Sequence, residues 1–271
     1  MALTKVLITV KTYPTISGKY DELVCTAGFR EDGTWIRIYP VPFRKMSYNE
    51  QYRKYDWIEL DLVKNTSDFR PESYRPFSHD NEIKIVGHIE TQNNWAERKQ
   101  IVLGKIYHNL TELIAEAHDK NINTSLAVFK PTTISDFKAE KTDREWDRDK
   151  MESLKQLNLF EPTKAGGAFE VVKKLPYKFR YVLTDNQGKE SKMMIEDWEI
   201  GQLYWNCLAR HEGDEAKAVE DVKKKYFDDF AKTKDLHLFL GTTMSNHDVS
   251  INPFMIIGTF HPKIDTQGSL F

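Results

Sequence analysis

The sequence predicts a protein of the α+β class, with a β-barrel-like N-terminal domain that contains short helices and a C-terminal α+β domain. Three observations lead to this prediction. The first half holds several short apolar and β-branched runs separated by turn-forming residues. In the second half, apolar residues recur every three or four positions along two stretches. Between the halves, Pro162 and the pair Gly166-Gly167 interrupt any regular pattern.

The N-terminal domain is predicted to be rich in strands. Gly33 marks a tight turn between two strand patterns and therefore predicts a hairpin. Asn109 starts a region with helical apolar spacing, and Thr91 is suited to cap a second short helix. Short strands with two small helices fit a compact barrel of the PUA-like or OB-like type. The predicted strands are residues 5–11, 22–29, 34–39, 55–64, 82–90, 126–129 and 134–140; the predicted helices are 91–103 and 109–120, with helical turns within 46–55.

The sequence predicts a domain boundary in the middle of the chain. Residues 142–157 are highly charged with a helical pattern, and residues 161–168 carry the proline and glycine residues typical of an exposed linker. We therefore expect a first domain of residues 1–141, a charged helix and linker of residues 142–168, and a second domain of residues 169–271. A fragment ending near Leu159 should then stay folded. In the competing interpretation, C-terminal strands complete the N-terminal sheet.

The C-terminal domain begins with a predicted strand, turn, strand and helix. Tyr177, Phe179 and Tyr181 alternate with Lys178 and Arg180, which places the rings on one face of the first strand. The two final strands are almost uniformly apolar, so we expect a sheet covered on both faces. The predicted elements are strands at residues 177–183, 190–195, 236–241 and 254–260, and helices at 196–210 and 214–232.

Composition limits the classes of function. The net charge of −2 means that a nucleic-acid partner would have to meet a local basic patch. Cys25 and Cys207 lie far apart and form no disulfide framework, which predicts a reducing compartment. The start of the chain has no signal-peptide pattern, and no apolar run approaches the ~18 residues of a membrane helix. We therefore expect a cytoplasmic protein with no membrane association.

A basic and aromatic group in the N-terminal domain is the leading functional candidate. Arginine offers a planar fork of donors to phosphate, and aromatic rings stack on bases. The prolines nearby stiffen the loops that present these side chains. Two alternatives remain open: interleaved carboxylates at Asp56, Asp61, Asp68 and Glu72 could pair with the arginines, or the proline-rich loop could cover the rings. The predicted nucleic-acid-binding residues are Trp35, Arg37, Tyr39, Arg44, Arg70, Tyr74 and Arg75.

Other candidate sites have ordinary structural explanations. Glu196, Asp197 and Glu199 stand at a helix start, where carboxylates favour the helix dipole; the alternative is a Mg²⁺ site of a nuclease. The histidines lack metal-binding spacing, and Cys25 resembles a small core residue more than a nucleophile. No Walker A, GxGxxG, GxSxG or HExxH motif is present, so no metal and no cofactor are predicted.

Three hypotheses follow from these patterns. The first is a nucleic-acid- or nucleotide-binding protein that uses the N-terminal surface, with DNA and RNA both open and a protein partner on the C-terminal domain. The second is a metal-dependent, nuclease-like enzyme with its carboxylates in the C-terminal half. The third is a protein-binding adaptor subunit whose exposed rings dock a partner. The sequence does not assign a catalytic residue.

Overall fold

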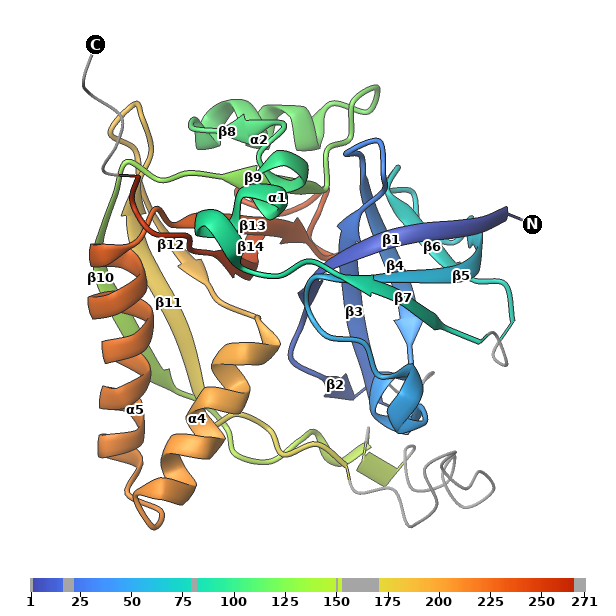
Figure 1. Ribbon diagram of the computed structural model, residues 1–271. Helices are drawn as coiled ribbons and strands as arrows, with labels where there is room; N and C mark the ends of the chain where they lie inside the picture. The colour runs from blue at the N-terminus through green and yellow to red at the C-terminus, as the bar shows by residue number, and fades with distance from the viewer. Residues whose placement is uncertain (1, 17–21, 79–81, 150, 153–170, 266–271) are drawn as a thin grey trace. The chain divides into compact units, whose positions relative to one another are not determined.

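The computed structural model describes residues 2–16, 22–78, 82–149, 151–152 and 171–265 (Figure 1). The chain divides into two compact units, each assembled from two separate stretches. Unit 1 consists of residues 1–90 and 141–176, and unit 2 consists of residues 91–140 and 177–271. The predicted α+β class is confirmed, with a barrel in the N-terminal part of the chain.

Unit 1 is built on a closed barrel of five strands. The ring runs β1–β3–β4–β6–β5 and closes where β5 pairs with β1; β4 and β6 pair in parallel and the other ring pairings are antiparallel. Five strands in a closed ring fit the OB-like alternative. The ring strands are β1 (Ala2–Lys11), β3 (Glu22–Phe29), β4 (Trp35–Val41), β5 (Asp56–Lys64) and β6 (Ser73–Pro76). Beside them lie β2 (Thr15–Ile16), β7 (Lys84–His88) and the 3₁₀ helices η1 (Phe43–Lys45) and η2 (Tyr48–Glu50).

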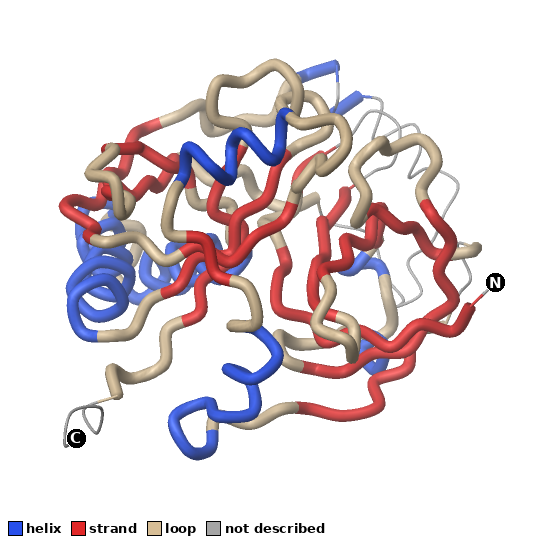
Figure 2. Tube along the Cα trace, turned by 90° about the horizontal axis from the view of Figure 1, so that it is seen from above, coloured by secondary structure: helices blue, strands red, loops and turns tan. Residues whose placement is uncertain are grey.

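The apolar alternation of the sequence places the barrel core. Ile58, Leu60 and Leu62 are buried along β5, and the residues between them are half-buried, as a strand with one core face requires. The strands curve round into a ring near the N-terminus (Figure 2). Gly28 allows β1 and β3 to approach each other, because a Cβ there would lie 1.9 Å from the carbonyl oxygen of Leu7.

Unit 2 contains two sheets and most of the helices. One sheet has the order β10–β11–β12 and the other β14–β13–β9–β8. The strands are β8 (Ile106–Tyr107), β9 (Leu126–Phe129), β10 (Thr133–Lys141), β11 (Tyr177–Thr184), β12 (Glu190–Met194), β13 (His237–Thr242) and β14 (Phe254–Phe260). The helices are α1 (Gln92–Val102), α2 (Leu110–His118), α4 (Trp198–Arg210) and α5 (Glu215–Lys223), which continues as the π-helix η3 (Lys224–Ala231).

Aromatic rings join the helices of unit 2 to its three-stranded sheet. Tyr177, Phe179 and Tyr181 are buried on one face of β11, as their alternation predicts. Tyr204 of α4 lies 5.6 Å from Tyr177 and 6.1 Å from Phe179 between ring centroids. The Tyr181 hydroxyl donates to the backbone oxygen of Tyr226 at 2.6 Å. Helices α4 and α5 lie side by side along this sheet (Figure 1).

The four-stranded sheet is covered on both faces. Every residue of β13 is buried, and β14 is buried except at the half-buried Met255. This confirms the expectation drawn from the uniform hydrophobicity of the two strands. His237 is therefore a core residue of β13, although polar residues in strands commonly face solvent.

The structure divides the chain differently from the sequence prediction. Strand β9 pairs with β13, and β10 neighbours β11. The sheets that contain β9 and β10, which precede residue 142, are therefore completed by strands that follow residue 176. Strand partners far apart in sequence are invisible to local patterns, which explains the difference. A fragment ending near Leu159 would lose these partners and is not expected to fold as predicted. Most of the predicted linker, residues 153–168, lies outside the described residues.

In the part of the chain that the structure describes, no helix has both the length and the apolar character needed to cross a membrane.

Candidate nucleic-acid interface

The predicted binding residues differ in exposure. Arg37 and Arg70 are 2% and 5% exposed, so the expectation of a surface position is wrong for both. Arg75 is exposed on β6. The remaining residues are half-buried: Trp35, Tyr39, Arg44 and Tyr74.

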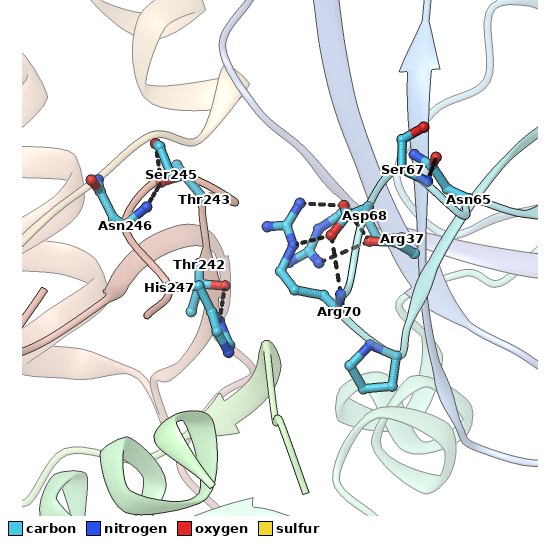
Figure 3. A network of polar contacts seen from close by, with 12 residues as sticks. Arg37, Asn65, Ser67, Asp68, Arg70, Thr242, Thr243, Ser245, Asn246 and His247 are labelled. Atoms are coloured by element: carbon cyan, nitrogen blue, oxygen red, sulfur yellow. Dashed lines mark hydrogen bonds and ion pairs between the residues drawn. The ribbon is translucent and has the colours of Figure 1, made fainter. Parts of the chain in front are cut away.

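Arg37 and Arg70 converge on the same buried network. The Asp68 carboxylate accepts hydrogen bonds from the Arg70 side chain, from Nε at 2.8 Å and from Nη2 at 2.6 Å (Figure 3). It also accepts from the Arg70 backbone N–H at 3.1 Å and from the Ser73 hydroxyl at 2.7 Å. Arg37 Nη1 lies 3.4 Å from the Ser73 Oγ, to which it donates. Strand register explains the contact, because Arg37 on β4 is opposite Ser73 on β6.

The electrostatics of this network favour a structural role. The hydrogen bonds from Arg70 and Ser73 outweigh desolvation and lower the pKa of Asp68 to about 2. Burial lowers the pKa of Arg37, and the nearby Arg70 guanidinium lowers it further. Substitution of Arg70 would leave a buried carboxylate without its bidentate donor, so it should destabilise the fold. A surface arginine that only contacts phosphate would not have this effect on stability.

The remaining half-buried residues have different surroundings. Trp35 packs against Phe29, with ring centroids 4.0 Å apart. Ile36 and Ile38 face the core, as the alternation of β4 predicts. Tyr39 lies near the end of β4, and Arg44 lies in η1. Trp35 therefore contributes to packing in unit 1, and its role toward a ligand stays a prediction.

Tyr74 lies at the centre of a cluster of cations. The Arg30 guanidinium carbon is 4.7 Å from the Tyr74 ring centroid, and the Lys64 ammonium is 4.9 Å from it. Both distances fall within the ~6 Å range of cation–π attraction. Lys64 is opposite Tyr74 in the β5–β6 register, and Arg30 follows the end of β3. We call Arg30, Lys64 and Tyr74 the Tyr74 cluster; Arg75 follows Tyr74 on β6, so its side chain points to the opposite face of the strand.

Two of the four interleaved carboxylates, Asp56 and Asp68, form ion pairs outside the Tyr74 cluster. Asp56 lies 3.6 Å from Arg53 and 2.6 Å from His88, and Asp68 pairs with Arg70. Among the described residues, no ion pair includes Arg30, Lys64 or Arg75. Arg30 Nη1 instead donates to Thr34 Oγ1 and to the Trp35 carbonyl, both at 3.2 Å. Lys64 donates to the Pro71 carbonyl, and Arg75 Nη1 donates to the Pro76 carbonyl at 3.3 Å. Arg30 does have a carboxylate nearby: hydrogen bonds from Thr34 lower the pKa of Asp32, and the Arg30 charge lowers it further.

Sequence reasoning missed Arg30 and Lys64. Each stands at a strand end, and only the pairing of β5 with β6 brings Lys64 to Tyr74. Strand β6 was itself not predicted, because its four residues, Ser73–Pro76, include a proline and lie within a loop-like sequence.

The carboxylates before α4 form a helix cap. Asp197 is the N-cap residue of α4, and its side chain accepts from the Glu199 backbone N–H at 3.3 Å. This confirms the predicted capping role. Burial raises the pKa of the neighbouring Glu196. Within the described ranges, no three His, Cys, Asp or Glu side chains are grouped so that they could hold a metal ion.

The other reactive side chains of unit 2 are held within its fold. His247 is buried, and its Nδ1 lies 2.8 Å from Thr242 Oγ1 (Figure 3). On its other side, Nε2 lies 2.8 Å from Asn123 Oδ1. His261 stacks on Phe230 at 3.7 Å between ring centroids. Burial raises the pKa of the Cys207 thiol, which disfavours the nucleophilic thiolate.

Comparisons with known proteins match two models of domains without an assigned role. A model described as domain of unknown function DUF8758 matches residues 2–104, and one described as domain of unknown function DUF8757 matches residues 107–271. Since the second match spans more than half of the chain, the protein belongs to the DUF8757 family. The border between the matches follows α1, whereas the border between the units precedes it. No curated protein matches the chain.

A similar solved structure is titled "Structure of murine DNA binding protein bound with ds DNA". The two chains are 9% identical, with 99% of this chain and 100% of that chain covered, and the TM-score is 0.33. A likeness this distant carries no argument about function.

Proposed function

We propose that this member of the DUF8757 family binds nucleic acid through the Tyr74 cluster of unit 1. The observation that carries the proposal is the gathering of Arg30 and Lys64 on the Tyr74 ring. The exposed Arg75, which is next to Tyr74 in the chain, is proposed as a further phosphate contact. In the described part of the chain none of these cations takes part in an ion pair, whereas Arg53 and Arg70 on the same barrel do.

The chemistry of the cluster suits a phosphate chain. Each lysine or arginine that meets a phosphate releases counterions, and this release supplies affinity without any sequence preference. The net charge of the whole chain is −2, so attraction to nucleic acid has to come from such a local group. Trp35, Tyr39 and Arg44 remain predicted contributors to binding.

Binding of fluorescein-labelled oligonucleotides, followed by fluorescence anisotropy at low salt, tests the proposal. Arg75→Ala should weaken binding severalfold and leave the melting temperature nearly unchanged, because Arg75 is exposed. It should also reduce the slope of log K against log salt by about 0.7–0.9, the contribution of one phosphate contact.

Arg53→Ala provides the matched control. Arg53 is also an exposed arginine of the barrel, but it pairs with Asp56. The control should bind like the wild type. If the wild type does not bind any oligonucleotide at low salt, or if Arg75→Ala and Arg53→Ala have equal effects, the proposal is refuted.

A further inference from the structure

We infer that the first turn of α1 is a conformational switch, which is left-handed while it is docked on Lys263–Asp265 and joins the right-handed helix when this contact opens. We call Asn93–Trp95 the α1 turn and Lys263–Asp265 the docking segment. The inference concerns unit 2 and goes beyond the proposed function of unit 1, so each can fail without the other. It comes from a strained backbone conformation and from contacts that tie this turn to a segment 169 positions later in the sequence.

The α1 turn is wound as a left-handed helix. Asn93, Asn94 and Trp95 have φ of 49°, 53° and 63° with ψ of 48°, 46° and 30°. In this conformation the Cβ of an L-residue crowds the following carbonyl oxygen, so it normally occurs at single residues. No other two neighbouring non-glycine residues in the described part of the chain have positive φ. Asparagine tolerates the left-handed region, whereas a bulky residue such as Trp95 is strained there.

The local sequence favours a right-handed helix over the same residues. Thr91 is suited to cap a helix that begins at Gln92, yet in the structure its side chain makes no capping hydrogen bond. Conflict between local preference and observed structure is expected at strained or functional sites. Contacts from outside the turn must therefore hold it in the left-handed state.

The docking segment supplies such contacts through Asn94. The Lys263 N–H donates to Asn94 Oδ1 at 2.8 Å, and Asn94 Nδ2 donates to the Lys263 carbonyl at 2.9 Å. One side-chain amide thus bonds both backbone groups of a single residue, as a neighbouring strand would. Lys263 is itself fixed by an isolated antiparallel bridge to Lys234. Since reversing the hand of the turn would move the Asn94 amide, these two bonds favour the left-handed state.

A carboxylate joins the turn to the rest of α1. The two oxygens of Asp265 have different partners: Oδ1 accepts from Asn94 Nδ2 at 2.5 Å, and Oδ2 accepts from Lys99 Nζ at 2.7 Å. Hydrogen bonds from Lys99 and then from Asn94 lower the pKa of Asp265, so the carboxylate is charged at neutral pH. The Asp265 side chain is 67% exposed. Water therefore reaches the contact, and it can open while the core of unit 2 stays folded.

Trp95 packs against the residues that lead into the docking segment. Its ring centroid lies 5.1 Å from those of Phe260 and His261. The Arg98 guanidinium carbon lies 5.0 Å from the same ring. Phe260 is buried in β14, so the ring contact attaches the most strained residue of the turn to the core of unit 2.

The place of the turn gives the switch a consequence. It stands just after Glu90, where the first stretch of unit 1 ends. Left- and right-handed residues turn the backbone in opposite directions. A change of hand would therefore alter the direction in which the chain enters unit 2. A ligand that binds the exposed docking segment would shift this equilibrium.

Nuclear magnetic resonance of the full chain tests the switch by two measurements. The three-bond coupling between amide and Hα protons reports φ of the α1 turn, and hydrogen exchange of the Lys263 N–H reports docking. Asp265→Ala and Lys99→Ala should each change the couplings toward right-handed values and speed this exchange severalfold. Asp228→Ala is the matched control, because Asp228 is another exposed aspartate of unit 2 with a lysine partner at 2.6 Å. It should change neither measurement.

Substitution at Asn93 separates the switch from an ordinary surface contact. Asn93 is exposed, and within the described chain its side chain has no hydrogen-bond or ion-pair partner. Glycine adopts positive φ freely, whereas alanine prefers the right-handed region. Exchange of the Lys263 N–H should therefore be about tenfold faster in Asn93→Ala than in Asn93→Gly, although neither substitution touches Lys263.

Three outcomes would overturn the inference. Equal exchange of the Lys263 N–H in the two Asn93 variants would show that docking does not depend on the hand of the turn. Left-handed couplings that persist in Asp265→Ala and Lys99→Ala would show that the turn is held without the docking segment. Amides of β13 that lose protection to the same extent as Lys263 would show that the variants destabilise the whole of unit 2 rather than open a local contact.

Discussion

Removing the Asp68 carboxylate should destabilise the barrel strongly. Asp68→Ala deletes the acceptor for three donors of Arg70 and for the hydroxyl of Ser73. The side chains of Asp68 and Arg70 are each 6% exposed, so water cannot replace the lost bonds without opening the structure. The Arg37 guanidinium, also buried, would lose one of the two carboxylates, Glu72 and Asp68, that offset its charge.

The magnitude follows from this burial. Breaking a buried ion pair by removing one partner typically costs about 3–5 kcal/mol, because an uncompensated charge stays inside the protein. Arg70→Ala should cost a similar amount. Glu82→Ala is the matched carboxylate control, since Glu82 lies 4.0 Å from Lys84 and both are exposed. Exposed pairs contribute about 0–1 kcal/mol.

Urea denaturation followed by tryptophan fluorescence measures these differences, and hydrogen exchange of the β4 and β6 amides reports on the barrel itself. The expected order is a large loss for Asp68→Ala and Arg70→Ala and almost none for Glu82→Ala. A free energy of unfolding for Asp68→Ala within about 1 kcal/mol of the wild type would show that the pair is not structural.

The remaining predictions concern pH and backbone contact. The folded-state pKa of Asp68 is lowered from 3.8 to about 2, so its stabilisation is present above pH ~4 and is lost as the pH falls toward 2. Asp68→Asn should remove about 2 kcal/mol of the acid dependence seen in the wild type, measured by urea denaturation between pH 5 and 2; an unchanged profile would contradict this. Gly28→Ala should unfold or severely weaken the barrel, because its Cβ would lie 1.9 Å from a backbone oxygen. In Gly87→Ala the Cβ would lie 3.7 Å from the Trp57 side chain, so this variant should change the melting temperature little. Equal melting temperatures for the two glycine variants would show that β1 can shift.

Local patterns were sufficient for most elements of the fold. The strands at residues 22–29 and 56–64 and the helices that follow Asn109 and Asp197 were all predicted, because alternation and capping are properties of neighbouring residues. The pairing of β9 with β13 was not predicted, since the local sequence of residues 126–129 does not identify a partner strand more than a hundred residues away. The division of the chain into units depends on this pairing and was missed for the same reason.

The candidate site shows the same limit at the level of single side chains. Asp68, Arg70 and Ser73 stand within six residues, and a carboxylate two positions before an arginine can pair with it in a loop as readily as it can face water. Arg37 on β4 lies opposite Ser73 and donates to its hydroxyl, so a second buried arginine belongs to the network that contains the Asp68–Arg70 pair. The parallel β4–β6 pairing therefore turns two predicted phosphate ligands into supports of the loop, while Arg75 of β6 stays exposed. Residue type identified the region, and strand register assigned the roles within it.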